Sequence, residues 1–363
     1  MPEPVIPYGR QSVDDDDIDA VVRVLKGDCL TRGPAVEAFE NALAERVEAR
    51  HAVAFSSGTA ALHGAAAVAG LGPGDRVATS SLSFAASAAC AAYVGATPVY
   101  VDIDPTTMNF DPGAVPDGIA ALVAVHYAGL PVDLAALNHR PPVVIEDAAQ
   151  ALGARTPDGP VGNCARSDMA CFSFHPVKSI TTGEGGAVTT NDDDLADRLR
   201  AFRHHGLRPV PEEGPWATRI DEIGFNYRLT DLQAALGTSQ LHKLNRFVAR
   251  REELARRYDD ALADLDVVCP ATAPPGTVHA RHLYPILVEN RANVVTELHR
   301  RAIGVQVHHV PIHHHPAYAA GTTPDDLPVT EAVYAHVLSL PLFYDLTVDE
   351  QDTVVTALRR ILS

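Results

Sequence analysis

The chain has 363 residues, of which 46% are hydrophobic and 21% charged, a composition typical of a globular protein that buries a large core. Its formal charge of −17 makes nucleic acids and anionic membrane surfaces poor partners, so any phosphate site must be built locally. The length predicts two domains, or one large α/β unit with an appendage.

The five cysteines are scattered and form no CxxC pair, which predicts reduced, mostly buried thiols in a cytoplasmic protein. The segment "MPEPVIPYGRQSVDDDD" has no basic region followed by an apolar one, so we expect no secretion signal. The longest run of low polarity, residues 84–101, is rich in alanine and is broken by Gly95 and Pro98. It favours a buried helix followed by a strand over a membrane span.

Strand and helix patterns alternate over the first 245 residues or so. "HAVAF" (51–55) predicts a short strand, and "SSGTAALHGAAAVAG" (56–70) begins with cap-forming hydroxyl residues and continues as a helix. Further strand patterns follow at 76–81, 96–104, 121–127 and 141–150. Two of them contain continuous apolar runs, so we expect a largely parallel sheet with helices on both faces.

The pattern changes near residue 245. Residues 244–265 predict a long amphipathic, charge-rich helix that links a large domain to a smaller one. The remaining chain predicts a strand, a helix, a second strand and two closing helices, the first three at 282–289, 291–302 and 305–310. The predicted domains are therefore 1–245 and a smaller α/β domain, 246–363.

Four features could converge on one small molecule, and the first is "SSGT" (56–59) at a strand-to-helix junction. Free backbone N–H groups and the helix dipole make such a terminus a receptor for a phosphate or carboxylate. The signal is weak alone, because most capped helices bind nothing. There is no GxxxxGK[ST] motif, so a nucleoside triphosphate loop is not supported.

The second feature is Asp147, directly after the apolar "VVI". A carboxylate at the carboxyl end of a parallel strand faces the crevice where α/β proteins bind ligands. The alternative is that Asp147 caps a helix formed by "AAQALGA".

The third feature is Lys178 in "FSFHPVKSITTGEGGAV" (172–188). A lysine in an apolar pocket has a lowered pKa, and its neutral amine can form a Schiff base with a carbonyl carbon. The alternative is a lysine that reaches the solvent. The fourth feature is Phe84 in "SLSFAAS", a ring that either belongs to the core or stacks on a flat cofactor.

Together the four features fit pyridoxal phosphate, which needs a phosphate site, a carboxylate for its ring nitrogen, a lysine and a stacking ring. At this point "VIEDAAQALGA", "FSFHPVKSITTGEGGAVTTND" and "GFNYRLTDLQAALGTSQL" (224–241) resemble the signature blocks of DegT-type (DegT/DnrJ/StrS) nucleotide-sugar aminotransferases. The resemblance covers the chain from about residue 7 to its end. It implies the α/β fold of aspartate aminotransferase, fold type I of the pyridoxal-phosphate enzymes, and a homodimer with shared active sites.

The resemblance also implies a role for individual residues. Lys178 would carry the cofactor and shuttle the proton, Asp147 would hold the pyridinium nitrogen, and Gln150 would approach the phenolic oxygen. The ring would lie between Phe84 and Ala149. The phosphate would be held by Ser57, Gly58, Thr59 and Ser173, together with Asn226 contributed across the dimer.

Within the family, the lysine block, "HLYPILV" and "VQVHHVPIHHHPAY" look closest to enzymes that aminate the 4-keto group of UDP-linked 4-keto-6-deoxy-N-acetylhexosamines. The resemblance implies glutamate as amino donor, and Thr31 and His313 are candidate sugar contacts. Amination of a 3-keto sugar or an aminocyclitol precursor, and dTDP in place of UDP, stay open. A sister branch that dehydrates its sugar has histidine in place of the lysine, so Lys178 argues against it.

Two other readings compete with the aminotransferase. The histidines of "HHVPIHHHP" and "RHHG" (203–206) could form a zinc site, but HExxH spacing is absent and Pro311 and Pro316 interrupt any helix that would align them. We therefore predict no metal. A non-catalytic regulator of the same fold is disfavoured because Lys178, Asp147 and the phosphate loop are all present.

Overall fold

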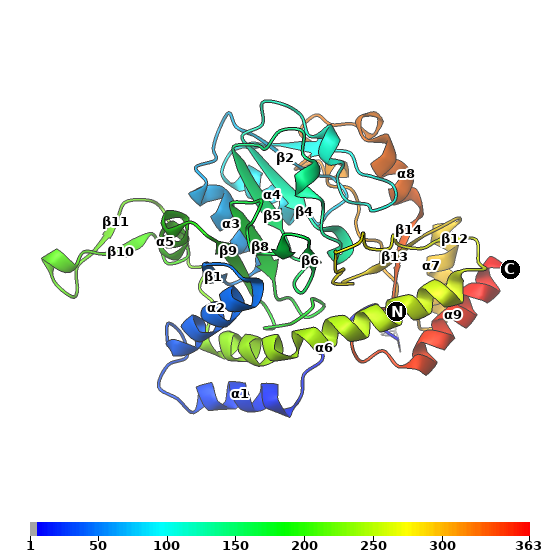
Figure 1. Ribbon diagram of the computed structural model, residues 1–363, viewed down its shortest axis with the longest axis horizontal. Helices are drawn as coiled ribbons and strands as arrows, with labels where there is room; N and C mark the ends of the chain where they lie inside the picture. Colours follow the sequence, from blue (N-terminus) through cyan, green and yellow to red (C-terminus); the bar gives the residue numbers. More distant parts are fainter. Residues whose placement is uncertain (1–5) are drawn as a thin grey trace.

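The computed structural model describes residues 6–363 and contains a seven-stranded sheet. This sheet lies at the centre of the larger part of the molecule (Figure 1). The strand order is β1-β9-β8-β5-β4-β2-β3. In chain order the strands are β1 His51–Phe55, β2 Arg76–Ser80, β3 Thr97–Val101, β4 Ala121–Val125, β5 Val143–Asp147, β8 Met169–Ser173 and β9 Gly186–Thr190. Only β9 runs antiparallel to its neighbours, so the predicted, largely parallel sheet is confirmed.

Helices cover both faces of this sheet, as the continuous apolar strands predicted. On one face, α2 (Pro34–Val47) and the first half of α6 (Asp231–Leu262) pack against side chains such as Phe172. On the other face lie α3 (Gly58–Val68), α4 (Ala86–Tyr93) and α5 (Asp193–Phe202). The low-polarity run 84–101 therefore contains helix α4 and strand β3, as expected. None of the helices among residues 6–363 combines the length and hydropathy that a membrane crossing needs.

The long helix α6 begins at Asp231, well before the predicted start at 244, because Thr230 and Gln233 form a reciprocal capping box at its first turn. Its first half contributes Leu244 and Phe247 to the core beneath the large sheet. Its second half contributes Leu254 and Tyr258 to a separate core with the C-terminal elements. The helix thus joins two hydrophobic cores and runs along one side of the molecule (Figure 1).

The C-terminal core is built on a three-stranded antiparallel sheet of β12 (Val267–Val268), β13 (Tyr284–Val288) and β14 (Val337–Leu340). The covering helices are α7 (Arg291–Arg300), α8 (Pro328–His336) and α9 (Val348–Leu362). The predicted strand at 305–310 is wrong, because only Gln306 makes a bridge, to Ser339 of β14. Beyond Gln306 the His308 carbonyl accepts from the Tyr127 hydroxyl instead of from a strand, and β13 pairs with β14.

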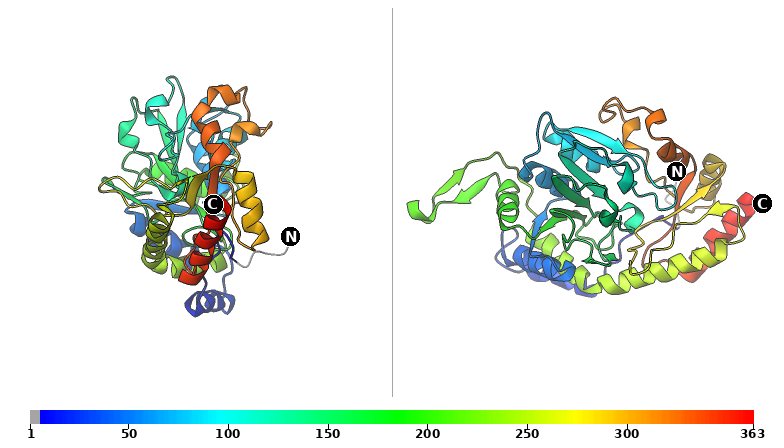
Figure 2. Two further views of the ribbon diagram at one scale, coloured as in Figure 1. Left: turned by 90° about the vertical axis from the view of Figure 1, so that its right-hand side faces the viewer. Right: turned by 45° about the horizontal axis from the view of Figure 1, so that its top comes forward.

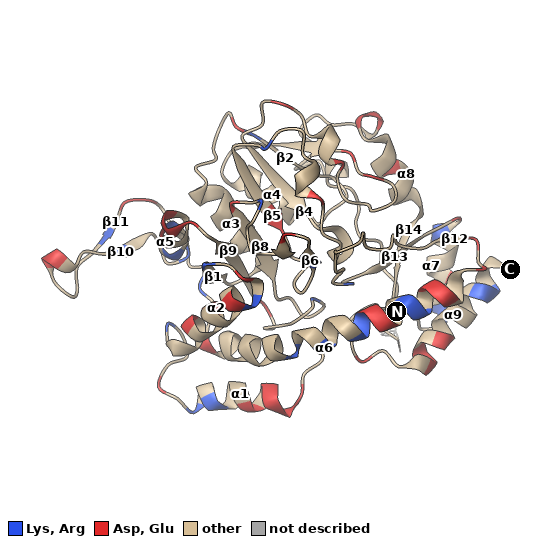
Figure 3. Ribbon diagram, in the orientation of Figure 1, with Lys and Arg blue, Asp and Glu red and all other residues tan. Residues whose placement is uncertain are grey.

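Two peripheral elements flank the sheet. The hairpin of β10 (Leu207–Pro209) and β11 (Thr218–Ile220) extends away from the body in Figures 1 and 2. Helix α1 (Asp15–Leu25) packs along α6, where Lys243 pairs with Asp14 and Asp17. Charged residues gather on the outer helices, while the central strands carry few, apart from the acidic end of β5 (Figure 3).

Candidate active site

The carboxyl edge of the large sheet brings the predicted phosphate residues together. Ser57 follows β1 and caps α3, its hydroxyl accepting from the N–H of Ala60 at 3.1 Å. A Cβ built on Gly58 would lie 2.7 Å from the Cβ of Ser173, and one on Gly186 would lie 2.4 Å from the backbone oxygen of Ser57. Only glycine allows backbones to approach so closely, so the first turn of α3, with Thr59, is held against the ends of β8 and β9. The result is a cradle of backbone N–H groups at a helix N-terminus.

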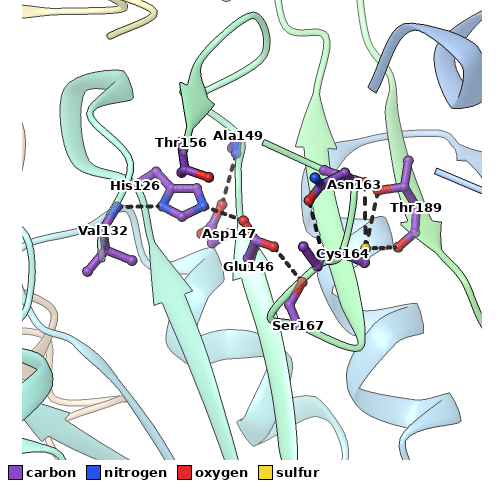
Figure 4. Close-up of polar contacts among 12 residues, drawn as sticks. His126, Val132, Glu146, Asp147, Ala149, Thr156, Asn163, Cys164, Ser167 and Thr189 are labelled. Carbon is purple, nitrogen blue, oxygen red and sulfur yellow. Dashed lines mark hydrogen bonds and ion pairs between the residues drawn. The ribbon is translucent and has the colours of Figure 1, made fainter. Parts of the chain in front are cut away.

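Asp147 is the last residue of β5 and is buried at the same edge. Its Oδ2 accepts a hydrogen bond from the Ser87 hydroxyl at 2.6 Å. Its Oδ1 accepts one from the Ala149 N–H at 3.2 Å (Figure 4). The chain from 148 to 153 forms turns rather than a helix, so the alternative that Asp147 caps a helix is wrong. The two hydrogen bonds hold the carboxylate in a fixed orientation.

Glu146, the preceding residue, points to the other side of β5 and forms a buried network (Figure 4). Its carboxylate accepts from Nε2 of His126 at 2.7 Å and from the Ser167 hydroxyl. Because Nδ1 of His126 accepts from the N–H of Val132, the proton of the neutral ring is on Nε2. The network fastens the ends of β4 and β5 to each other and so fixes the position from which Asp147 projects.

Lys178 lies in the loop that joins β8 to β9. The loop is closed at its base by backbone hydrogen bonds from Phe174 to Gly185 and from Thr182 to Phe174. Burial of the amine lowers the pKa of Lys178 to about 8, although the negative charge of Asp147 opposes the shift. Glu184, the acidic residue nearest in sequence, is exposed, and no carboxylate among residues 6–363 forms an ion pair with Lys178, so the lysine is a desolvated amine.

Histidines surround Lys178, and sequence reasoning did not assign them to the site. Nε2 of His282 lies 3.4 Å from Nζ of Lys178, and the His282 ring is buried. Burial is the main cause that lowers the pKa of His282 far below its usual range, and the positive charge of Lys178 is the second. The same two causes lower the pKa of His308 to about 4. These rings are therefore neutral near pH 7. The only signals were the block "HLYPILV", which begins with His282, and the unusual density of histidines near 308.

Further predicted residues lie beside this edge. Gln150 is buried, and its Oε1 accepts from the Ala128 N–H at 2.7 Å, so its amide nitrogen is the end that can donate. Phe84, between β2 and α4, is 61% exposed, and its ring centre is 6.0 Å from that of His309. Ala149 follows Asp147 by two residues and is partly buried. The exposed ring of Phe84 is therefore free to cover a ligand at this edge of the sheet.

The remaining three predicted residues are placed differently. The side chains of Thr31 and Asn226 are exposed, and each residue makes a backbone bridge, to Thr230 and His204 respectively. His313 has a fully buried side chain with Nδ1 2.7 Å from the Ser81 hydroxyl. Nothing in this arrangement assigns a sugar contact to Thr31 or His313, and both stay predictions.

The comparisons with known proteins agree with this geometry. Residues 11–359 match the model of the DegT/DnrJ/EryC1/StrS aminotransferase family. The chain belongs to this family. It is 37% identical to the spore coat polysaccharide biosynthesis protein SpsC of Bacillus subtilis, over 98% of this chain and 97% of SpsC.

Solved structures show the same similarity over the whole fold. Helicobacter pylori PseC, an aminotransferase involved in the biosynthesis of pseudoaminic acid, superimposes with a TM-score of 0.91 at 31% identity, over 98% of this chain and 99% of PseC. A Streptococcus pneumoniae protein solved in its PMP form gives a TM-score of 0.91 at 26% identity, over 98% of each chain. This member of the DegT/DnrJ/EryC1/StrS family is thus an aminotransferase with the predicted α/β fold, and aminotransferases use pyridoxal phosphate.

The residues present fit that cofactor. The first turn of α3, held close to Ser173 and Gly186, presents backbone N–H groups at a helix N-terminus, which suits a phosphate. Asp147 supplies a buried, oriented carboxylate for a pyridinium nitrogen, and Lys178 supplies a partly neutral amine. The buried thiols of Cys90 and Cys171 do not compete for an aldehyde, because burial, and next the charge of Asp147, raise the pKa of both.

Proposed function

We propose that this protein transfers the amino group of an amino acid, glutamate, to the C4 keto group of a nucleotide-linked 4-keto-6-deoxy sugar in amino-sugar biosynthesis. The main observation in support of amino transfer is that the desolvated amine of Lys178 lies at the same sheet edge as the buried carboxylate of Asp147. Support for the sugar comes from the similarity to PseC and SpsC, and from the sequence blocks that resemble 4-keto-sugar aminotransferases.

When bound, pyridoxal phosphate supplies an aldehyde that exchanges an amino group and a ring that accepts an electron pair. In our proposal Ser57, Gly58, Thr59 and Ser173 hold its phosphate through the cradle. Asp147, fixed by Ser87, keeps the ring nitrogen protonated. Gln150 donates to the phenolic oxygen, and Phe84 and Ala149 cover the two ring faces.

Nζ of Lys178 holds the cofactor between turnovers and moves the proton at the substrate carbon during them. An amine whose pKa is near 8 can accept and return a proton near neutral pH, whereas one at 10.5 would stay charged. The neutral ring of His282, 3.4 Å away, can accept a hydrogen bond from this amine without adding a second positive charge. His282 is in this view a positioning residue for Lys178.

The substrate is tested with the cofactor's own absorption. Glutamate should remove the visible band of the loaded protein, and only the true keto substrate should restore it. A panel of UDP- and dTDP-linked 4-keto and 3-keto sugars, with an aminocyclitol precursor, separates the alternatives that the sequence leaves open. Restoration by a 3-keto sugar alone, or by none of them, would overturn the proposed substrate.

We also propose that the active enzyme is a cytoplasmic homodimer in which Asn226 completes the phosphate site of the partner subunit. Exposed apolar side chains flank Asn226, with Ile223 86% and Phe225 38% exposed, and such patches are typical of interfaces. Mixing inactive Lys178→Ala and Asn226→Ala proteins tests this, because a hybrid dimer would contain one intact site. Activity that does not return on mixing, in proteins shown to exchange subunits, would contradict it.

The division into domains 1–245 and 246–363 is likewise our proposal. It is supported by the two hydrophobic cores that share α6: along this helix, the first core ends at Val248 and the second begins at Leu254. Limited proteolysis, or a measurement of the motion between the two domains when substrate binds, would test whether they move as separate bodies.

A further inference from the structure

Two histidines and a glutamate from the C-terminal part of the chain lie close together beside Ser81, which directly follows β2. His313 and His314 lie in a short 3-10 turn (Ile312–His314), and Glu331 lies in α8. One ligand atom from each residue lies within 4.8 Å of the others. Oε1 of Glu331 is 3.0 Å from Nε2 of His313 and 2.7 Å from Nε2 of His314.

The His313 ring is oriented and only partly satisfied. Its Nδ1 lies 2.7 Å from the Ser81 hydroxyl, and the Ile312 N–H donates to the Ser81 carbonyl at 2.9 Å. Its side chain is fully buried, yet Nε2 makes no hydrogen bond of acceptable geometry, although Glu331 is close. A buried imidazole nitrogen that faces a carboxylate, on a ring fixed through its other nitrogen, is the arrangement that metal-binding histidines have.

Glu331 is held by an independent set of contacts. Asp102, just after β3, accepts from the N–H groups of Val329 and Thr330 at 2.9 and 2.8 Å and from the Thr330 hydroxyl at 2.7 Å. These bonds fix the first turn of α8, from which Glu331 projects. The two histidines are tied to the end of β2 and the glutamate to the end of β3, so the three side chains are brought together by the sheet.

We propose that His313, His314 and Glu331 form a zinc site. Two imidazoles and a carboxylate are ligands that Zn²⁺ prefers, at bond lengths that put ligand atoms about 3.3 Å apart in a tetrahedron. The observed 3.0 and 2.7 Å require an opening of a few tenths of an ångström. The side chains of His314 and Glu331 are 27% and 26% exposed, so they can move and water can supply the fourth ligand.

The sequence argued against zinc because its histidines have no HExxH spacing. The structure adds Glu331, 17 residues from His314 along the chain, and leaves His204 and His205 out of the cluster. Bound zinc would fasten the 312–315 turn and α8 to the β2–α4 loop that carries Phe84, so its role would be structural.

The test is titration of the chelator-treated, cofactor-loaded protein with ZnCl₂ by calorimetry and by thermal melting. We expect one zinc per chain, a higher melting temperature, and no change in the visible absorption of the cofactor, which separates this site from Lys178. His314→Ala and Glu331→Gln should each weaken binding at least tenfold. His315→Ala, a change of the adjacent exposed histidine, should leave binding unchanged.

No zinc binding to the unmodified protein would overturn the proposal. So would binding that survives both His314→Ala and Glu331→Gln, or binding lost equally in His315→Ala. Circular dichroism of each variant shows whether it is folded. Because glutamate and ketone turnover can be measured separately, failure of the zinc site leaves the aminotransferase proposal intact, and the reverse also holds.

Discussion

Replacing Lys178 by methionine isolates the free energy that burial of its charge costs. Burial lowers the pKa of this lysine from 10.5 to about 8, and this lowering corresponds to about 3 kcal/mol. This cost applies when the amine is protonated in the folded protein, that is, below about pH 8. Methionine has a similar length and no charge, so its contribution to stability does not depend on pH.

The direction in which stability changes with pH follows from the number of protons that the folded and unfolded chains bind. Since the pKa is lower in the folded cofactor-free protein, the unfolded chain binds more protons between about pH 8 and pH 10.5. The stability of the native sequence should therefore rise with pH relative to Lys178→Met. Integrating over the two pKa values gives a relative gain of about 2 kcal/mol between pH 7 and pH 9.5.

The assay is urea unfolding of both cofactor-free proteins at several pH values. Taking the difference between them cancels the titration of every other group. A difference in unfolding free energy that stays constant over this range would refute the conclusion that Lys178 is a desolvated amine.

Three further substitutions test the hydrogen bond to Asp147, the close approach at Gly58 and the buried ion pair of Lys243. Ser87→Ala removes the 2.6 Å hydrogen bond to Asp147 and should weaken retention of the cofactor several-fold, as measured by dialysis followed by absorbance. Ser83→Ala, which removes a hydroxyl that contacts Ser87 but not Asp147, is the milder control. Gly58→Ala puts a Cβ 2.7 Å from Ser173 and should cost about 1–3 kcal/mol and most cofactor binding, whereas Gly72→Ala, whose Cβ meets nothing closer than 3.9 Å, should be tolerated in thermal melting. Lys243→Met leaves Asp17, which is fully buried, without its cation and should cost about 3–5 kcal/mol in urea unfolding, while an unchanged midpoint would show that α1 does not depend on this pair.

Much of the larger sheet could be predicted because each strand carries its own signal. The apolar run 121–125 is buried at every position in β4, and β1 has the predicted bounds. Ser57 also caps α3 as its residue type indicated. In these segments local pattern and tertiary environment agree, because a strand covered by helices on both faces is apolar throughout.

The C-terminal part was harder to predict because pairing over long distances decides its strands. "VQVHHV" has the alternation of a strand, yet only Gln306 pairs, whereas the short "VLSL" of β14 forms the ladder. The site shows the same limit. Asp147 and Lys178 were found from strand ends and local composition, but His282 lies 104 residues from Lys178, and nothing local indicates their contact.

The most direct test of the whole account is borohydride reduction of the cofactor-loaded enzyme, followed by peptide mass mapping. The chain has only three lysines, Lys26, Lys178 and Lys243, so the modified residue can be assigned without ambiguity. We predict that the added phosphopyridoxyl mass is on the peptide that contains Lys178 and that Lys178→Arg abolishes it. A mass added at Lys26 or Lys243 instead, or an enzyme that transaminates with Lys178 unmodified, would contradict the account.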